Sequence, residues 1–192
     1  NFMKTRRDSS RGHNVSELVL AKNLVLNYWA KSVECCPRKT HILPMFRNEV
    51  YENIMSGKWR DVLDEGWYKS LPQPQRGRTQ MRQDGRQGTT PPQSDDATPF
   101  CFLEQHIDLD LDQDGYDEPY IITFERQSKC PVRIVTRFDD PAAITRVASG
   151  KHSGKVLRIE ATEYFTKKTF IPSPDGGIYD IGFGVFLGPL NE

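Results

Sequence analysis

Apolar side chains in the first stretch of the chain, residues 1–71, recur at the spacing of an α-helix. The stripe consists of Leu18, Val19, Val25, Leu26 and Trp29. It predicts a helix that begins near Ser16 and ends at or before Pro37. A stripe this rich in bulky side chains is typical of a packed core, so we expect residues 1–71 to form the helical part of the domain.

A second, shorter helix is predicted over residues 48–55, where Val50, Tyr51 and Ile54 form an apolar stripe. Asn48 is a suitable N-cap, and Gly57 is a suitable end because glycine readily takes the left-handed conformation that follows a helix. Tryptophan and aliphatic residues over 59–67 predict one or two further helical turns packed on the others.

Residues 72–99 differ in composition from the rest of the chain. The stretch is rich in Pro, Gln and Gly, and Met81 is its only bulky apolar side chain, which predicts a flexible loop. Its basic residues are Arg76, Arg78, Arg82 and Arg86. Arginines can contact the phosphates of nucleic acid, but no aromatic residues are interleaved with them. A solvated loop and a nucleic-acid or partner-binding segment both stay open.

Residues 102–111 and 132–138 alternate between apolar and polar positions, which is the period of a half-buried β-strand, and residues 100–181 are expected to form the β-rich part of the domain. Strands are expected over residues 102–111, 120–124, 132–138 and 156–171, and Asp114-Gly115 is a typical hairpin turn. The chain is therefore expected to adopt an α+β fold, with a helical layer packed beside a small antiparallel sheet of hairpins and a long flexible insertion.

Composition excludes several classes of protein. The chain has 26 basic and 26 acidic residues, so its net charge of zero argues against a protein that coats nucleic acid or an anionic membrane. No apolar run approaches the roughly 20 residues that span a bilayer, so no membrane partner is expected. The four cysteines contain no Cys-x-x-Cys pair, and the four histidines are scattered, which argues against a disulfide scaffold or a zinc site.

An acidic run supplies the sharpest local pattern. Asp110, Asp112 and Asp114 stand at positions one, three and five of an EF-hand-like calcium loop, and Gly115 stands at position six. Position twelve is Ile121 in place of the usual bidentate Glu. A hairpin tip with a solvated acidic face and a Ca²⁺ site are the two interpretations. Neither a nucleophile elbow nor a phosphate-binding loop is present, so a protein without catalytic residues is expected.

The segment from Asp112 to Thr123 contains the pattern Asp-x-Asp-Gly-x-x-Glu-Pro-Tyr followed by an apolar strand. Further matching segments cover residues 164–177, 179–184 and 187–192. Together they resemble the portal (head-to-tail connector) proteins of tailed bacteriophages. The resemblance is strong over residues 104–192, looser over residues 14–67, and absent from residues 72–99.

The resemblance implies a structural role without catalysis or a cofactor. Portal subunits form a ring, usually of twelve copies, at one vertex of the capsid. The ring passes double-stranded DNA, and it docks the terminase, capsid or scaffolding proteins and tail adaptors. The implied location is the virion, and the host cytoplasm during assembly. On this interpretation the chain is a wing-domain fragment, and the channel-lining stem and the clip lie outside it.

The resemblance also implies roles for particular segments. Residues 182–192 would form the hinge between wing and stem helix, with Gly182, Gly184 and Gly188 allowing the chain to turn and Pro189 opening the helix. The arginine segment would face a neighbouring subunit, a scaffolding or capsid protein, or packaged DNA. The alternative to a portal is a non-enzymatic α+β binding module that holds calcium in the acidic hairpin loop.

Overall fold

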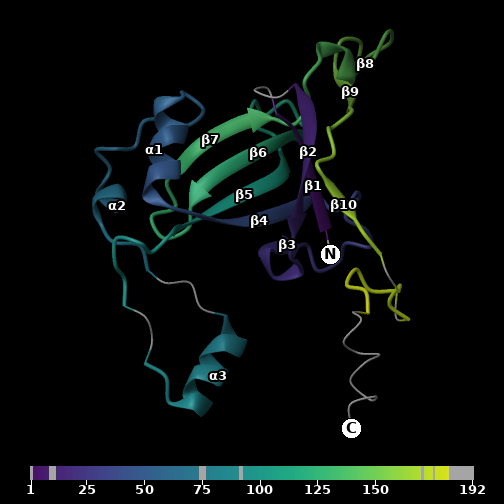
Figure 1. Ribbon diagram of the computed structural model, residues 1–192. Helices are drawn as coiled ribbons and strands as arrows, with labels where there is room; N and C mark the ends of the chain where they lie inside the picture. The colour runs from purple at the N-terminus through teal and green to yellow at the C-terminus, as the bar shows by residue number, and fades with distance from the viewer. Residues whose placement is uncertain are drawn as a thin grey trace. The chain divides into compact units, whose positions relative to one another are not determined.

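The computed structural model describes residues 2–8, 12–73, 77–90, 93–169, 171–174 and 176–181. Within these residues the chain combines α-helices with antiparallel strands, which confirms the α+β prediction (Figure 1). The helices are α1 (Arg47–Met55), α2 (Gly66–Lys69), α3 (Arg78–Gln87) and the short 3-10 turns η1 (Ala21–Asn23) and η2 (Pro141–Ala143). The strands are β1 (Phe2–Asp8), β2 (His13–Val19), β3 (Leu24–Leu26), β4 (Arg38–Met45), β5 (Phe100–Leu109), β6 (Glu118–Glu125), β7 (Pro131–Thr136), β8 (Ile144–Arg146), β9 (Val156–Ile159) and β10 (Phe165–Lys167).

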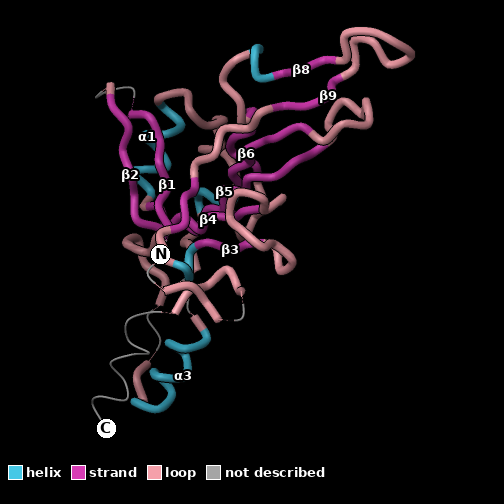
Figure 2. The backbone as a smooth tube through the Cα atoms, turned by 90° about the vertical axis from the view of Figure 1, so that its right-hand side faces the viewer, coloured by secondary structure: helices cyan, strands magenta, loops and turns pink. Residues whose placement is uncertain are grey.

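The strands form three sheets, drawn in magenta in Figure 2. One has the order β10-β1-β2, and its first hairpin pairs Phe2 with Val19 and Asp8 with His13. The largest has the order β3-β4-β5-β6-β7, and β8 with β9 forms a separate hairpin. Strand β10 joins β1 from the far end of the chain, so the first sheet closes only when both ends of the sequence have come together.

The chain forms two compact units whose boundaries cut through the four strands β4 to β7. Unit 1 comprises residues 1–41, 105–121 and 135–192, and unit 2 comprises residues 42–104 and 122–134. These boundaries differ from a division into helical, loop and strand stretches. Each unit draws on segments far apart in the sequence, because strands of one sheet need not be neighbours along the chain.

Unit 2 has an aromatic core. Its buried side chains are Val50, Ile54, Trp59, Val62, Phe100, Phe102 and Val132. Trp59 lies against Phe102 with ring centroids 4.7 Å apart, and Trp67 meets Phe102 edge-on at 5.8 Å. Full burial of one such phenyl ring contributes roughly 1.5–3 kcal/mol. The predicted packing of Trp59 and Trp67 in a core is confirmed, whereas the helical turns predicted over residues 59–67 are limited to α2, which begins at Gly66.

Unit 1 has a second core, made by Phe2, Val19, Leu24, Val33 and Phe165. Its members come from the N-terminal hairpin, the segment around β3 and strand β10. The first strands of the chain are therefore held by a residue more than a hundred positions away in sequence.

The helix predicted from Ser16 is wrong, because residues 13–19 and 24–26 are strands. Val19 and Leu24 are buried, whereas Leu18 is 55% and Trp29 84% exposed, so the stripe does not lie on one buried face. Short stretches of apolar residues can fit both periods, and pairing with β1 and β4 decides in favour of strands.

Helix α1 confirms the helix predicted over residues 48–55, with a different N-terminus. Phe46 is the N-cap residue, and its backbone N–H donates to Glu49 Oε2 at 2.7 Å, while Asn48 lies inside the first turn. Gly57 ends the helix as predicted, since it takes a φ of +70° and its N–H donates to the Ile54 carbonyl at 2.9 Å.

The stretch predicted as a loop contains the ten-residue helix α3. Arg, Gln and Met are good helix formers, and Gly88 closes the helix in the left-handed conformation, where its N–H bonds to the Asp84 carbonyl. The Pro and Gly content of the whole stretch hides the proline-free segment between Pro74 and Pro91, which contains α3.

The strand expected over residues 156–171 is instead two short strands, β9 and β10, which belong to different sheets.

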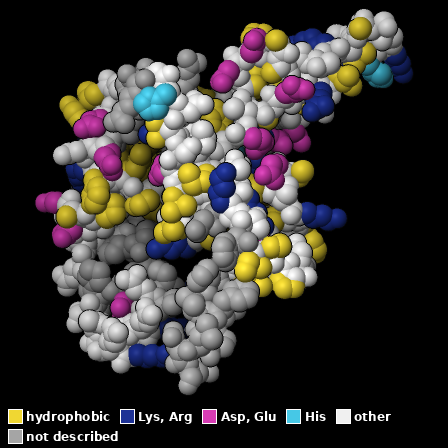
Figure 3. Space-filling view, turned by 45° about the vertical axis from the view of Figure 1, so that its right-hand side comes forward, with side chains coloured by type: hydrophobic (Ala, Val, Ile, Leu, Met, Phe, Trp, Pro, Cys, Tyr) yellow, Lys and Arg dark blue, Asp and Glu magenta, His cyan; other side chains and the backbone are white. Residues whose placement is uncertain are grey.

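All four cysteines are free thiols. Within the described ranges, no helix combines the length and apolar character that crossing a membrane requires. Acidic and basic side chains both appear on the face seen in Figure 3, without one sign dominating it.

Candidate functional site

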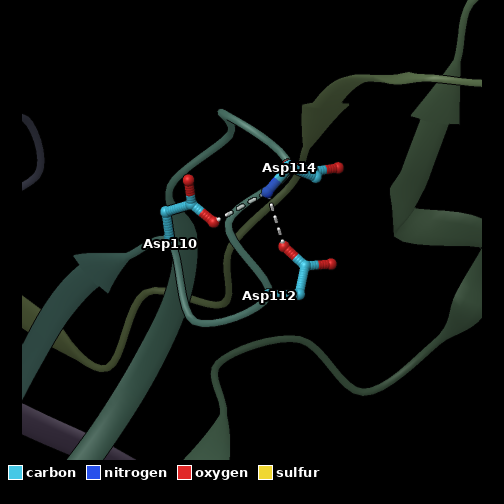
Figure 4. Close-up of side chains that lie close together, drawn as sticks. All are labelled: Asp110, Asp112 and Asp114. Carbon is cyan, nitrogen blue, oxygen red and sulfur yellow. Dashed lines mark hydrogen bonds between the residues drawn. The ribbon is translucent and has the colours of Figure 1, made fainter.

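The acidic turn, residues 110–115, connects β5 to β6 in unit 1, as the sequence predicts. Its backbone is folded by its own carboxylates. The Asp114 N–H donates to Asp110 at 3.2 Å and to Asp112 at 3.2 Å (Figure 4). Asp110 also accepts a hydrogen bond from the Gly115 N–H at 3.0 Å. Gly115 has a φ of +93°, which favours glycine. The Asp and Gly pattern is therefore sufficient to shape the turn.

The three carboxylates are close enough to share one cation. One oxygen from each of Asp110, Asp112 and Asp114 lies within 4.8 Å of the others. Oxygens bound to one Ca²⁺ at 2.3–2.6 Å are at most about 5 Å apart, so the spacing fits a hard cation. Asp110 is half-buried, and the other two carboxylates are exposed. The predicted set of three is brought together, and exposed carboxylates of this kind also exist without a metal ion.

Tyr116, which follows the acidic turn, links it to strand β9 of unit 1. Tyr116 donates its N–H to Asp114 Oδ1 at 2.8 Å, and its hydroxyl accepts a hydrogen bond from the Ile159 N–H at 3.0 Å. A shallow hollow of about 590 Å³ lies beside it, lined by the turn and by Asn27, Arg38 and Asp108. The charges on this lining suit a polar group better than an apolar ligand.

The acidic turn changes the electrostatics at the start of β6. Burial raises the pKa of the Glu118 carboxyl above its ordinary value of 4.5, and the negative charge of Asp112 raises it further. The pKa of Tyr120 is also raised, first by burial and then by the charge of Glu118, to which its hydroxyl donates at 3.3 Å. A cation in the turn would oppose the part of these shifts that comes from negative charge.

A charge cluster with two buried cations and two partly exposed carboxylates lies elsewhere in unit 1, and the sequence analysis missed it. Arg137, which is 5% exposed, donates to Asp108 at 3.0 Å and to Glu163 at 3.2 Å. Lys39, with no exposed surface, pairs with the second oxygen of Glu163. Two positive and two negative charges thus balance, and the cluster ties together β4, β5 and the segments next to β7 and β10.

Two buried histidines lie on β4 and β5, the strands that carry Lys39 and Asp108 of the charge cluster. His41 and His106 are 4% and 2% exposed, and their rings lie 5.9 Å and 5.0 Å from the ring of Phe165. The signal in the sequence was alternation, because Lys39 with His41 on β4 and His106 with Asp108 on β5 are i, i+2 pairs that share a face of their strands. Which strand would lie opposite was not readable from that pattern.

Of the four predicted arginines, Arg78, Arg82 and Arg86 lie on α3 and are exposed. Arg76 lies outside the described residues. The predicted hinge residues Gly182, Gly184, Gly188 and Pro189 also lie outside them. The acidic turn and the arginines therefore belong to different units, and each is considered separately.

The acidic turn places three carboxylates close together, and the charge cluster links strands β4 and β5 with the segments next to β7 and β10. Comparison of the chain with models of known protein families gave no match, and comparison with curated proteins gave none either.

Proposed function

We propose that this chain is wing-domain sequence of a tailed-bacteriophage portal protein, a structural subunit of the ring at the portal vertex. The observation that carries the proposal is the acidic turn followed, after two residues, by Glu118-Pro119-Tyr120 at the start of β6. In the portal segment that the sequence resembles, the same acidic turn leads into an apolar strand. Strand β6 buries Pro119 and Ile121 on one face, in keeping with that pattern.

The charge cluster gives a structural reason for the same interpretation. Glu163 directly precedes the second portal-like segment, residues 164–177, and Asp108 lies just before the first. Arg137 bridges these two acidic residues. A subunit that bears load during packaging needs its segments locked together. This network resists their separation because breaking it leaves the buried charge of Lys39 or Arg137 unpaired.

In this role the protein performs no reaction. Its ring would provide the channel through which double-stranded DNA enters and leaves, and the docking surface for terminase, scaffolding or capsid proteins and tail adaptors.

The mass and shape of the full-length protein that carries this sequence test the proposal. Light scattering and negative-stain electron microscopy are expected to give a ring of about a dozen subunits with an axial hole. A protein that stays monomeric at high concentration, alone and with scaffolding protein, would refute it.

The alternative is a non-enzymatic α+β binding module with calcium in the acidic turn, which the 4.8 Å spacing of the three carboxylates favours. It predicts saturable Ca²⁺ binding by calorimetry that Asp112→Asn abolishes. Asp95→Asn, outside the turn, is the control. Absence of Ca²⁺ binding at millimolar concentration would exclude this alternative without affecting the portal proposal.

A further inference from the structure

Helix α3 aligns three arginines that the sequence alone left in a loop. Arg78, Arg82 and Arg86 are four residues apart, so each is turned by only about 40° from the one before. They rise by about 6 Å per step and form a stripe about 12 Å long on one face. A loop would impose no such alignment.

The stripe is exposed, and among the described residues no acidic group forms an ion pair with it. None of the residues of α3 is buried, and the three arginines are exposed. In the described part of the chain no ion pair occupies their guanidinium groups. Asp84, the one acidic residue of the helix, is turned by about 160° from the middle of the stripe. Three arginines minus one aspartate leave α3 with a charge of +2.

The chemistry of the stripe selects a polyanion with regularly spaced charges. Arginine presents a planar fork that binds phosphate oxygens in pairs. Each strand of B-DNA carries a charge about every 3.4 Å of helix axis, so a 12 Å stripe spans several phosphates. Single-stranded nucleic acid is normally held by base stacking, and α3 has no aromatic residue to stack on.

We propose that α3 contacts the phosphate backbone of double-stranded DNA through Arg78, Arg82 and Arg86. The contact is independent of base sequence, because the helix offers guanidinium groups to phosphates only. The inference rests on the proposed function for the identity of the polyanion, since a portal meets double-stranded DNA. It adds a DNA-contacting element in unit 2 to a protein whose net charge is zero.

The test measures binding of the full-length protein to a fluorescent 30-base-pair duplex at several KCl concentrations. Losing three phosphate contacts makes the slope of log K against log salt shallower by about 2.7, so the fall in K between 50 and 200 mM salt becomes about 40-fold smaller. The variant Arg78→Gln/Arg82→Gln/Arg86→Gln is expected to show this change in slope. Lys22→Gln/Lys58→Gln/Lys151→Gln removes the same charge from exposed positions outside α3, and it is expected to keep most of the slope.

A second variant keeps the net charge of α3 and changes only the alignment of its arginines. Arg82→Gln/Gln80→Arg keeps the composition but moves one guanidinium group about 160° around the helix, so it should lose about one contact, or 0.9 in slope. An unchanged slope in this variant, or an equal loss in the lysine control, would overturn the inference. Equal competition by poly-glutamate at matched charge would also overturn it, because the site would then accept an acidic polypeptide as readily as DNA.

The same preparations distinguish this inference from the portal proposal. If light scattering shows rings for both wild type and the arginine variant but the salt slope is equal, only the DNA contact of α3 is wrong. If no rings form and the slope still falls by about 2.7, α3 binds DNA and the portal proposal is wrong.

Discussion

Replacing Glu163 by glutamine removes the carboxylate that the charge cluster shares. A glutamine can still accept one hydrogen bond, but it carries no charge to balance Lys39. The other partner of Lys39 is the Glu34 carbonyl, 3.4 Å from its ammonium group, and Lys39 has no exposed surface through which water could compensate for the lost charge. Removing one partner of a buried ion pair costs about 3–5 kcal/mol. Because the Glu163 side chain is itself 36% exposed, we expect the lower end of that range, about 3 kcal/mol in the free energy of unfolding.

Removing the other partner of this ion pair, Lys39, should destabilise the protein much less. Lys39→Met removes the charge that is fully buried, and Glu163 keeps Arg137 at 3.2 Å as well as its contact with water. We expect a loss of about 1 kcal/mol or less for this variant, since replacing a buried charge by an apolar side chain of similar volume is often neutral. In the double variant Arg137 keeps Asp108 at 3.0 Å, so the double variant should cost less than Glu163→Gln alone.

Equilibrium urea unfolding, followed by tryptophan fluorescence and circular dichroism, measures these differences as shifts of the midpoint at constant slope. Glu160→Gln is the control, since Glu160 and Arg158 are 3.9 Å apart with side chains 69% and 72% exposed. It should change stability by less than about 0.5 kcal/mol. A cost for Glu163→Gln below about 1 kcal/mol, or equal to that of Lys39→Met, would refute the role assigned to the cluster.

Three further outcomes are expected. Gly115→Ala should destabilise the protein by about 1 kcal/mol or more in thermal unfolding, because its φ of +93° is strained for any residue with a Cβ; an unchanged melting temperature would contradict the turn geometry. Gly85→Ala in α3 should instead raise helicity and strengthen α3 by up to about 1 kcal/mol, because its φ is not positive and the added Cβ meets nothing within 4 Å; a loss of helicity by circular dichroism would disprove the helix. The raised pKa of Glu118 means that its contribution to stability is fully present below pH 4.5 and is lost as pH rises through the folded value. An NMR titration should show this pKa falling in Asp112→Asn, and a pKa that stays the same would exclude the charge of Asp112 as a cause.

Local pattern was sufficient for part of the fold. The apolar run over residues 120–124 predicts a strand, and β6 (Glu118–Glu125) contains it. The acidic turn and helix α1 were predictable for the same reason. Their spacing, turn residues and capping groups lie within a few positions of one another in the sequence.

Helix α3 shows how an average over composition misleads. Residues 72–99 are poor in apolar side chains as a whole, yet residues 78–87 contain good helix formers and end at a glycine. Intrinsic propensity acts over about ten residues, so a longer window conceals it. The three arginines were noticed in the sequence, but only the helix places them on one face.

The N-terminal strands and the charge cluster were decided by tertiary structure. Residues 13–26 fit both periods, and they become strands because β1 and β4 offer unpaired edges to them. Lys39, Asp108, Arg137 and Glu163 are unremarkable charged residues in the sequence. They meet because the strands that carry them are brought together in the folded chain, and charges can be buried there only because each has a partner from another segment. Local sequence determined helix α1, helix α3 and the acidic turn, while contacts between distant segments determined the N-terminal strands and which charges could lie inside.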